Sequence, residues 1–370
     1  MTVIDLFAGC GGWDLAAREL GLDPLGIELN PDACATREAV GLATINADIA
    51  ALDPADFAPC EGFIASPPCQ DFSVAGKGAG RDGDRGRLVE EVPRWVDALR
   101  PRWVACEQVP PVLPIWREFA HRLEQWGYRT WCGLLSSERY GVPQTRERAF
   151  LLASLDGPVL PPEPTHQEYR HGEPARREVN LFGDLEPWVS MADALGWGMT
   201  ERPLGTITSA LTKGARETLI RERDRGAWLV DRRTNSRGPG GTQVPIARRP
   251  CDTPAPTVDT KAGARWVIRS VQTVNGGPLA ERDVDDPAFT VGSRADQWVF
   301  DRPATTIAGA QSENAIRLTL AEGLTLQGFP PDYPVQGTKT AQWLQVGNAV
   351  PPPLALAVLR QVVPAMEAAA

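Results

Sequence analysis

The chain has 370 residues, of which 42% are hydrophobic and 23% charged, and this length is typical of two domains rather than one. The composition excludes collagen-like, low-complexity and small disulfide-stapled proteins. No stretch reaches the roughly 18 apolar residues of a membrane span, and the first residues lack the pattern of a signal peptide. We therefore expect a soluble, cytoplasmic protein. The net charge of −9, taken over the whole chain, argues against a nucleic-acid partner.

The seven cysteines are odd in number, widely scattered and never arranged as a Cys-x-x-Cys pair. Neither a disulfide framework nor a zinc site is indicated by such spacing. We expect reduced thiols and no bound metal.

The first 150 residues alternate short apolar runs with helix-like segments, and Gly- or Pro-marked loops separate them. The predicted strands are Val3–Phe7, Leu25–Leu29, Ala43–Ile49, Gly62–Ser66, Arg102–Cys106, Tyr128–Leu135 and Ala149–Ser154. The predicted helices are Trp13–Leu20, Pro31–Val40, Leu88–Arg100 and Val112–Trp126. This alternation predicts an α/β fold with a mostly parallel, doubly wound sheet, whose ligands lie at the carboxyl ends of the strands.

The character of the sequence changes after Ser154, where the Pro-rich segment 158–164 predicts a linker. The following region is rich in turns and carries a weak Pro-x-x-Thr repeat, which either marks hairpins with polar tips or simply recurrent strand starts. A short apolar helix over Pro353–Ala369 is expected to dock on the protein. We predict three parts: residues 1–165, residues 166–330 and a C-terminal segment, 331–370, that returns to the first.

Glycines at Gly9, Gly11 and Gly12 stand between the first predicted strand and helix. Absent side chains there let backbone N–H groups approach a ligand at a helix N-terminus. Glu28 and Asp48 end the next two predicted strands, and an acid at the second strand is placed to hold ribose hydroxyls. The alternative for each acid is a solvated loop carboxylate.

Cys69 follows the fourth predicted strand in the segment Ser66-Pro67-Pro68-Cys69. A thiol at a sheet edge, after two stiffening prolines, is a candidate nucleophile, although a buried inert cysteine is the usual alternative. The Gly-rich, charged segment 74–87 suits a lid that closes on an anionic substrate, or an ordinary loop.

A carboxylate and two arginines complete the candidate site. Glu107 ends the fifth predicted strand. Arg146 and Arg148 precede the seventh, and because they are two positions apart they share a face where the backbone is extended. Without further context this would be a surface ion-pair network.

These segments, in this order, resemble the cytosine-5 DNA methyltransferase family. The resemblance rests on Asp5–Gly12, Ser66–Ser73, Glu107–Val109, Gln144–Arg148, Arg317–Pro330 and Gln345–Pro351. It implies a Rossmann-like fold of the S-adenosylmethionine-dependent methyltransferase type, with a smaller, β-rich target-recognition domain. One departure is Gln108, where the family has an asparagine that tethers the cysteine loop; the amide is retained.

The resemblance implies that Cys69 attacks carbon 6 of a flipped-out cytosine, Glu107 bonds ring N3 and the exocyclic amine, and Arg146 orients Glu107. Arg148 would donate to the cytosine O2. S-adenosyl-L-methionine would be the cofactor and duplex DNA the partner. The implied cofactor-binding residues are Phe7, Ala8, Gly9, Cys10, Gly11, Gly12, Glu28, Leu29, Asp48, Ile49, Pro68, Asn348 and Val350. The predicted DNA-binding residues are Gln70, Ser73, Lys77, Arg81, Arg216, Lys261, Arg265 and Arg294.

Two alternatives stay open: the tRNA-directed branch of the same fold, and a catalytically silent DNA binder. The long insert between Arg148 and Arg317 favours DNA, since RNA-directed relatives carry a short, different small domain. We expect a monomer, with a cognate restriction enzyme as a possible partner. The segment Arg202–Arg237 has a local net charge of +5, so the acidic total does not exclude a phosphate backbone.

Overall fold

The computed structural model describes residues 2–69, 71–72, 80–83, 85–170, 178–180, 183–195, 227–237, 243–248, 266–270, 299–300, 316–317 and 319–363. Its largest element is a seven-stranded sheet with the order β3-β2-β1-β4-β5-β7-β6. The strands are β1 (Val3–Leu6), β2 (Leu25–Glu28), β3 (Thr44–Asn46), β4 (Gly62–Ala65), β5 (Trp103–Gln108), β6 (Arg129–Ser136) and β7 (Glu147–Ser154). β1 to β5 are parallel, whereas β7 runs antiparallel to β5 and β6. The predicted mostly parallel sheet is confirmed.

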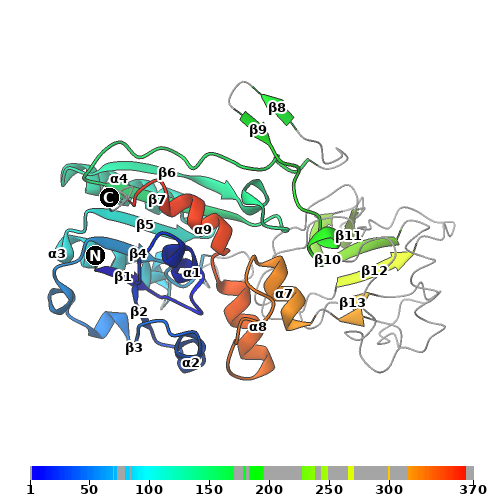
Figure 1. Cartoon of the computed structure of the whole chain (residues 1–370), viewed down its shortest axis with the longest axis horizontal. Coiled ribbons are helices and arrows are strands. Elements are labelled where there is room, and N and C mark those ends of the chain that lie inside the picture. Colours follow the sequence, from blue (N-terminus) through cyan, green and yellow to red (C-terminus); the bar gives the residue numbers. More distant parts are fainter. Residues whose placement is uncertain are drawn as a thin grey trace.

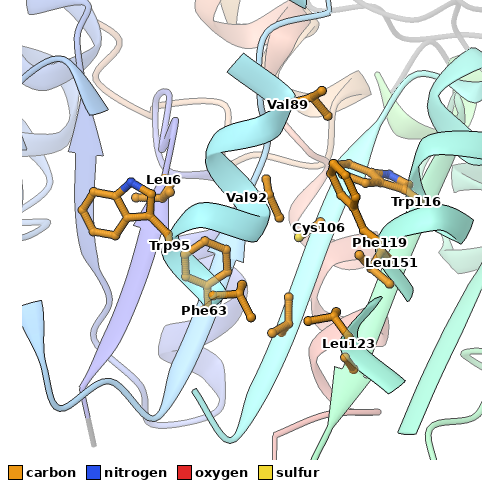
Figure 2. Close-up of a cluster of buried hydrophobic side chains, with 14 of the residues drawn as sticks. Leu6, Phe63, Val89, Val92, Trp95, Cys106, Trp116, Phe119, Leu123 and Leu151 are labelled. Atoms are coloured by element: carbon orange, nitrogen blue, oxygen red, sulfur yellow. The ribbon is translucent and has the colours of Figure 1, made fainter. Parts of the chain in front are cut away.

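Helices cover both faces of this sheet (Figure 1). On one face α3 (Glu91–Leu99) and α4 (Leu113–Gln125) pack through aromatic and branched side chains, which Figure 2 shows against Phe63, Cys106 and Leu151 of the strands. On the other face, α1 (Gly12–Glu19) and α9 (Pro352–Leu359) pack against alternate residues of the same strands. Because both faces are buried, the central strands are mostly apolar, with Asp5 in β1 and Glu107 and Gln108 at the end of β5 as the polar exceptions among β1, β4 and β5.

Several boundaries differ from the sequence prediction. The helix expected over Pro353–Ala369 is α9, which ends at Leu359. The helix expected over Leu88–Arg100 begins as a 3-10 turn, Gly86–Glu90, and becomes α-helical only at Glu91. Pro93 explains the shift, because it has no N–H and fits only in the first turn, where that group has no helical partner. The strand expected over Ala43–Ile49 shortens to β3, since Asp48 caps a 3-10 turn by accepting a 3.0 Å hydrogen bond from the Ala50 amide.

The region after the large sheet is β-rich where it is described. A hairpin, β8 (Glu178–Asn180) and β9 (Gly183–Leu185), precedes the short helix α5 (Met191–Ala194). Next come an antiparallel sheet and a two-stranded ladder: β10 (Ala227–Arg237), β11 (Gln243–Arg248), β12 (Trp266–Ser270), β13 (Val299–Phe300) and β14 (Ile316–Arg317). The four Pro-x-x-Thr repeats lie outside the described residues, and in the described part no helix is long and apolar enough to cross a membrane.

The chain then returns through α7 (Leu320–Leu326) and α8 (Lys339–Asn348), which Figure 1 shows between the large sheet and the β10–β12 sheet. The segment 329–350 packs behind the loop that follows β1. The Tyr333 hydroxyl donates to the Cys10 carbonyl at 2.6 Å, and the Thr36 hydroxyl donates to the Gln345 side chain at 2.7 Å. The C-terminal segment therefore packs against the loop after β1, at which the sequence predicts that the cofactor binds.

Candidate active site

The order of the strands brings the chemistry-bearing segments together. β1 lies between β2 and β4 in the sheet. The chain therefore adds β2 and β3 on one side of β1 and the later strands on the other side, which reverses the strand order at β1. In such sheets the crevice at the carboxyl ends beside this reversal is the usual ligand site. The Gly9–Gly12 loop follows β1, the Cys69 segment follows β4, and Glu107 lies near the end of β5, which neighbours β4.

Glu107 forms its ion pair with Arg148, with 3.0 Å between the Glu107 Oε1 and Arg148 Nε atoms. The side chains are 7% and 8% exposed, so water screens this pair little. Strand register explains the choice of partner: Glu107 stands opposite Phe150, and Arg148 is its diagonal neighbour on the same face.

In the described part of the chain Glu107 pairs with Arg148 and not with Arg146, and the expectation that Arg146 orients Glu107 stays a prediction. Arg146 lies two residues before Arg148, immediately ahead of β7, and donates from Nη1 to the Gly347 carbonyl at 2.9 Å. That carbonyl belongs to the last turn of α8, where helical partners are missing and a cation is favoured. Burial, followed by the neighbouring Arg148, lowers the pKa of Arg146 to about 9.

Cys69 is half-buried and lies in the electrostatic field of these charged groups. Burial raises the pKa of its thiol and is the largest influence. Arg148 and Arg146 act in the opposite direction, whereas Glu107 raises the pKa further. The two arginines are therefore the charged side chains that favour the reactive thiolate.

Gln108 anchors the cysteine loop. Its side-chain amide donates from Nε2 to the Pro67 carbonyl, and its Oε1 accepts a hydrogen bond from the Val109 amide. The side chain is 2% exposed. Gln108 thus makes the tether that the resemblance implies for the family's asparagine.

At the end of β2, the Glu28 carboxylate accepts hydrogen bonds from the Gly9 amide at 2.8 Å and the Asn30 amide at 2.7 Å. Each oxygen keeps a second lone pair for a ligand hydroxyl. The adjacent Leu29 is 62% exposed, an apolar surface that a flat ring would cover. A carboxylate beside an uncovered apolar side chain fits a nucleoside, so these residues fit the implied cofactor.

The glycines of the β1 loop have different roles. A side chain on Gly9 would meet little, because the nearest atom to its Cβ position is the Phe7 carbonyl oxygen at 4.0 Å. A Cβ on Gly12 would lie 2.2 Å from the Val350 carbonyl oxygen, and Gly11 has a φ of +99°. Gly9 is therefore open toward a ligand, whereas Gly11 and Gly12 serve the turn and the packing of the C-terminal segment.

The other predicted cofactor residues divide by exposure. Asp48 and Asn348 are exposed, and Phe7 and Pro68 are half-buried. Those whose side chains are buried are Ala8, Cys10, Ile49 and Val350. Burial raises the pKa of the Cys10 thiol to about 12, which makes that thiol chemically inert.

Of the predicted DNA-binding residues, the structure describes only Arg81. Its guanidinium pairs with Glu118 at 2.8 Å and Glu90 at 3.0 Å, so contact with a phosphate would have to compete with two carboxylates. Its DNA contact stays a prediction. The predicted residues that lie outside the described ranges are Gln70, Ser73, Lys77, Arg216, Lys261, Arg265 and Arg294.

The position of the Asp71 side chain explains why some residues of segment 74–87 are glycines. Its Oδ2 accepts hydrogen bonds from the Arg85 amide at 3.0 Å and the Gly86 amide at 2.8 Å. A Cβ on Gly83 would lie 2.3 Å from the same oxygen. These glycines make room for Asp71.

Sequence reasoning missed a buried amide relay behind the arginines. Gln144 donates from Nε2 to the Leu326 carbonyl at 2.9 Å and to the Gln327 side chain, and Gln327 donates to the Ala349 carbonyl at 2.6 Å. Gln144 and Leu326 are 182 residues apart, so no local pattern marks the contact. Among the residues that the structure describes, no group of three or more His, Cys, Asp or Glu could hold a metal.

The sheet topology, the glycine loop after β1 and the acid at the end of β2 define a Rossmann-like methyltransferase. The C-5 cytosine-specific DNA methylase family matches residues 1–363, and the chain belongs to this family. It is therefore an enzyme of the DNA cytosine-5 methyltransferase class.

Relatives support the same assignment. The chain is 25% identical over 372 residues to the type II methyltransferase M.NgoFVII of Neisseria gonorrhoeae, covering 98% of this chain and 86% of the relative. It is 27% identical over 386 residues to M1.HphI of Haemophilus parahaemolyticus, with the same coverage of 98% and 86%. A methyltransferase structure from Entamoeba histolytica has a TM-score of 0.58 at 13% identity, covering 100% and 99% of the two chains. At that identity the structural likeness concerns the fold alone.

Proposed function

We propose that this enzyme transfers a methyl group from S-adenosyl-L-methionine to carbon 5 of a flipped-out cytosine, in a specific duplex DNA sequence, through a covalent Cys69 adduct. The observation that carries the proposal is the half-buried Cys69 on a loop tethered by Gln108, in the field of the Glu107–Arg148 ion pair. A nucleophile near a carboxylate and a cation would suit one flipped-out base.

Carbon 5 of cytosine is a weak nucleophile, so methyl transfer needs covalent activation. The Cys69 thiolate forms a bond to carbon 6, and the electrons displaced from the ring double bond build up at N3 and O2. Glu107 would deliver a proton to N3 and accept a hydrogen bond from the exocyclic amine, and Arg148 would stabilise charge at O2. S-adenosylmethionine, when bound, supplies the electrophilic methyl group. Loss of the carbon 5 proton then restores the double bond and expels Cys69 as thiolate.

For the cofactor, Glu28 would accept the ribose hydroxyls, Leu29 and Ile49 would border the adenine, and the Gly9 region would face the methionine part. Asp48 and Asn348 are exposed and would supply polar contacts. The hydrogen bonds from Gly9 and Asn30 hold the Glu28 carboxylate in a single orientation.

For DNA, residues 166–330 would form the target-recognition domain, and 1–165 together with 331–370 the catalytic part. Extruding the target base costs about a few kcal/mol, which contacts to the rest of the duplex must offset. The names of the relatives, which are type II methyltransferases, favour a modification role. In this proposal a cognate restriction enzyme would be the partner, and the methyltransferase itself would act as a monomer.

Trapping the adduct tests the proposal. In duplex DNA that carries 5-fluorocytosine at the target, fluorine cannot leave carbon 5 as a cation. After methyl transfer the enzyme should therefore stay covalently attached to the DNA through Cys69. Cys69→Ser should lose both the adduct and methylation while keeping cofactor affinity within about twofold. Bisulfite sequencing of DNA from expressing cells identifies the target. A fully active Cys69→Ser enzyme, or transfer to tRNA that outcompetes duplex DNA, would overturn the assignment.

A further inference from the structure

The cysteine loop has few backbone hydrogen bonds available to hold it. The Ser66 amide makes the last ladder bond, to the Leu6 carbonyl at 3.2 Å. Pro67 and Pro68 follow and have no N–H, so neither can donate to a neighbouring strand. Between the end of β4 and Cys69, the loop must therefore be held in place by contacts of its side chains and of the Pro67 carbonyl, which accepts a hydrogen bond from Gln108.

Trp13 provides a second attachment. It is the second residue of α1, 3% exposed, and its indole Nε1 donates to the Ser66 hydroxyl at 2.9 Å. The indole also packs edge-on against Phe150, with 6.2 Å between ring centroids. Phe150 stands opposite Glu107 in the sheet. A single side chain thus connects the helix after the β1 loop, the cysteine loop and the strand that carries Arg148.

Burial alone does not produce this hydrogen bond. Trp95, Trp103 and Trp343 are each 0% exposed, and in the described part of the chain their indole N–H groups have no partner. Trp13 is oriented differently because the hydroxyl of Ser66 stands at the end of β4, next to the first turn of α1.

We propose that Trp13 and Ser66 are positioning residues that set the cysteine loop relative to the loop after β1. This inference rests on the proposed function, in which one loop carries the nucleophile and the other faces the methyl donor. Since α1 begins at Gly12, a fixed Trp13–Ser66 bond fixes the spacing between the two. Near-attack geometry depends strongly on such spacing, so losing the bond should slow the reaction more than it weakens binding.

A double-mutant cycle tests the pair. Trp13→Phe and Ser66→Ala should each slow adduct formation on 5-fluorocytosine DNA about five- to tenfold, the effect of one hydrogen bond. The double variant should be no slower than the slower single variant, because both remove the same interaction. Ser66→Thr keeps the hydroxyl and should restore most of the rate. The Kd for S-adenosylmethionine should change less than about twofold in all four.

The matched control is Trp95→Phe, on α3 (Figure 2), which removes a buried indole N–H that bonds nothing among the described residues. Its rate should equal that of the wild type. Equal slowing by Trp95→Phe and Trp13→Phe, or additive losses in the cycle, would overturn the inference. Absence of any adduct with the wild-type enzyme would instead contradict the proposed function, so the two failures are distinguishable.

Discussion

The two arginines near Cys69 differ in what they contact. Arg148 holds Glu107, whereas Arg146 holds the last turn of α8 through the Gly347 carbonyl, next to Asn348 at the rim of the proposed cofactor site. Both side chains are nearly buried, so each contact is made at low dielectric. We therefore expect substitution of Arg148 to change mainly the rate of methyl transfer, and substitution of Arg146 to change mainly the affinity for the cofactor.

Lysine substitutions test this separation, because lysine keeps the charge and loses the planar donor fork. Arg148→Lys should reduce the methylation rate about 100-fold, the typical loss of one preorganised donor, with an unchanged Kd for S-adenosylmethionine. Arg146→Lys should raise that Kd, since the α8 terminus loses its cap. Single-turnover kinetics and calorimetric titration measure the two effects, and an unchanged cofactor Kd in Arg146→Lys would contradict the second role.

Gln108 offers a test of the cysteine tether. Gln108→Leu keeps the size of the side chain and leaves the buried Pro67 carbonyl without its donor, a cost of about 1–3 kcal/mol. We expect a lower urea midpoint and a slower adduct. Gln108→Asn restores the family's amide with one methylene less and should lie between Leu and the wild type. A Gln108→Leu variant with the stability and adduct rate of the wild type would show that the tether is dispensable.

At the scale of elements, buried polar contacts join helices that are far apart in sequence. Asp14 on α1 and Arg37 on α2 (Pro31–Ala39) form a paired hydrogen bond of 2.7 and 2.8 Å, with both side chains 0% exposed. Gly26 makes room for this pair, because a Cβ there would lie 2.0 Å from the Arg37 guanidinium. The helices that flank the β1 loop are thus locked to each other.

The amide relay joins α7, α8 and the approach to β7. Gln327→Leu should lower the free energy of unfolding by roughly 2 kcal/mol or more, because the Ala349 carbonyl and the Gln144 amide each lose a partner. Chemical denaturation measures the change. Gln125→Leu, at an exposed position that ends α4, is the control and should stay within about 0.5 kcal/mol of wild type. Equal effects of the two changes would contradict a role for the relay.

At the scale of the whole molecule, stability should depend on pH through Glu138, which is 4% exposed. Burial raises the pKa of its carboxyl from 4.5 to about 8. The folded state therefore keeps a proton that the unfolded state releases, and stability should fall as pH rises from about 4.5 to 8, by an amount on the order of a few kcal/mol.

Glu138→Gln removes this titration. The variant should be more stable than the wild type above pH 8 and should lose the slope below it, which urea unfolding at pH 6, 7 and 8.5 would reveal. Parallel pH profiles for the variant and the wild type would show that Glu138 is not the responsible group.

The net charge of the whole molecule is the sum of a basic segment and an acidic remainder. The net of −9 combines +5 over Arg202–Arg237 with −14 over the remainder. Because phosphate contacts are made locally, a basic segment can bind DNA on an otherwise acidic protein. Total charge was therefore a poor guide to the partner.

The sequence by itself determined the alternating strands and helices, which follow from periodicity and local residue type acting over a few residues. The order of its motifs resembles that of the family, and this resemblance supplied the roles predicted for Cys69, Glu107, Arg146 and Arg148. The sequence also placed Glu28 at the end of its strand, because strand ends are marked by local loop signals.

Only the tertiary structure decided which residue each side chain contacts. Strand register assigned Glu107 to Arg148, and the returning C-terminal segment assigned Gly12 to packing and Arg146 to α8. Trp13 met Ser66, and Gln144 met Gln327, across separations of 53 and 183 residues. Such contacts arise when distant segments pack into one core, and nothing in the local sequence around either partner encodes the distance or the direction of the other.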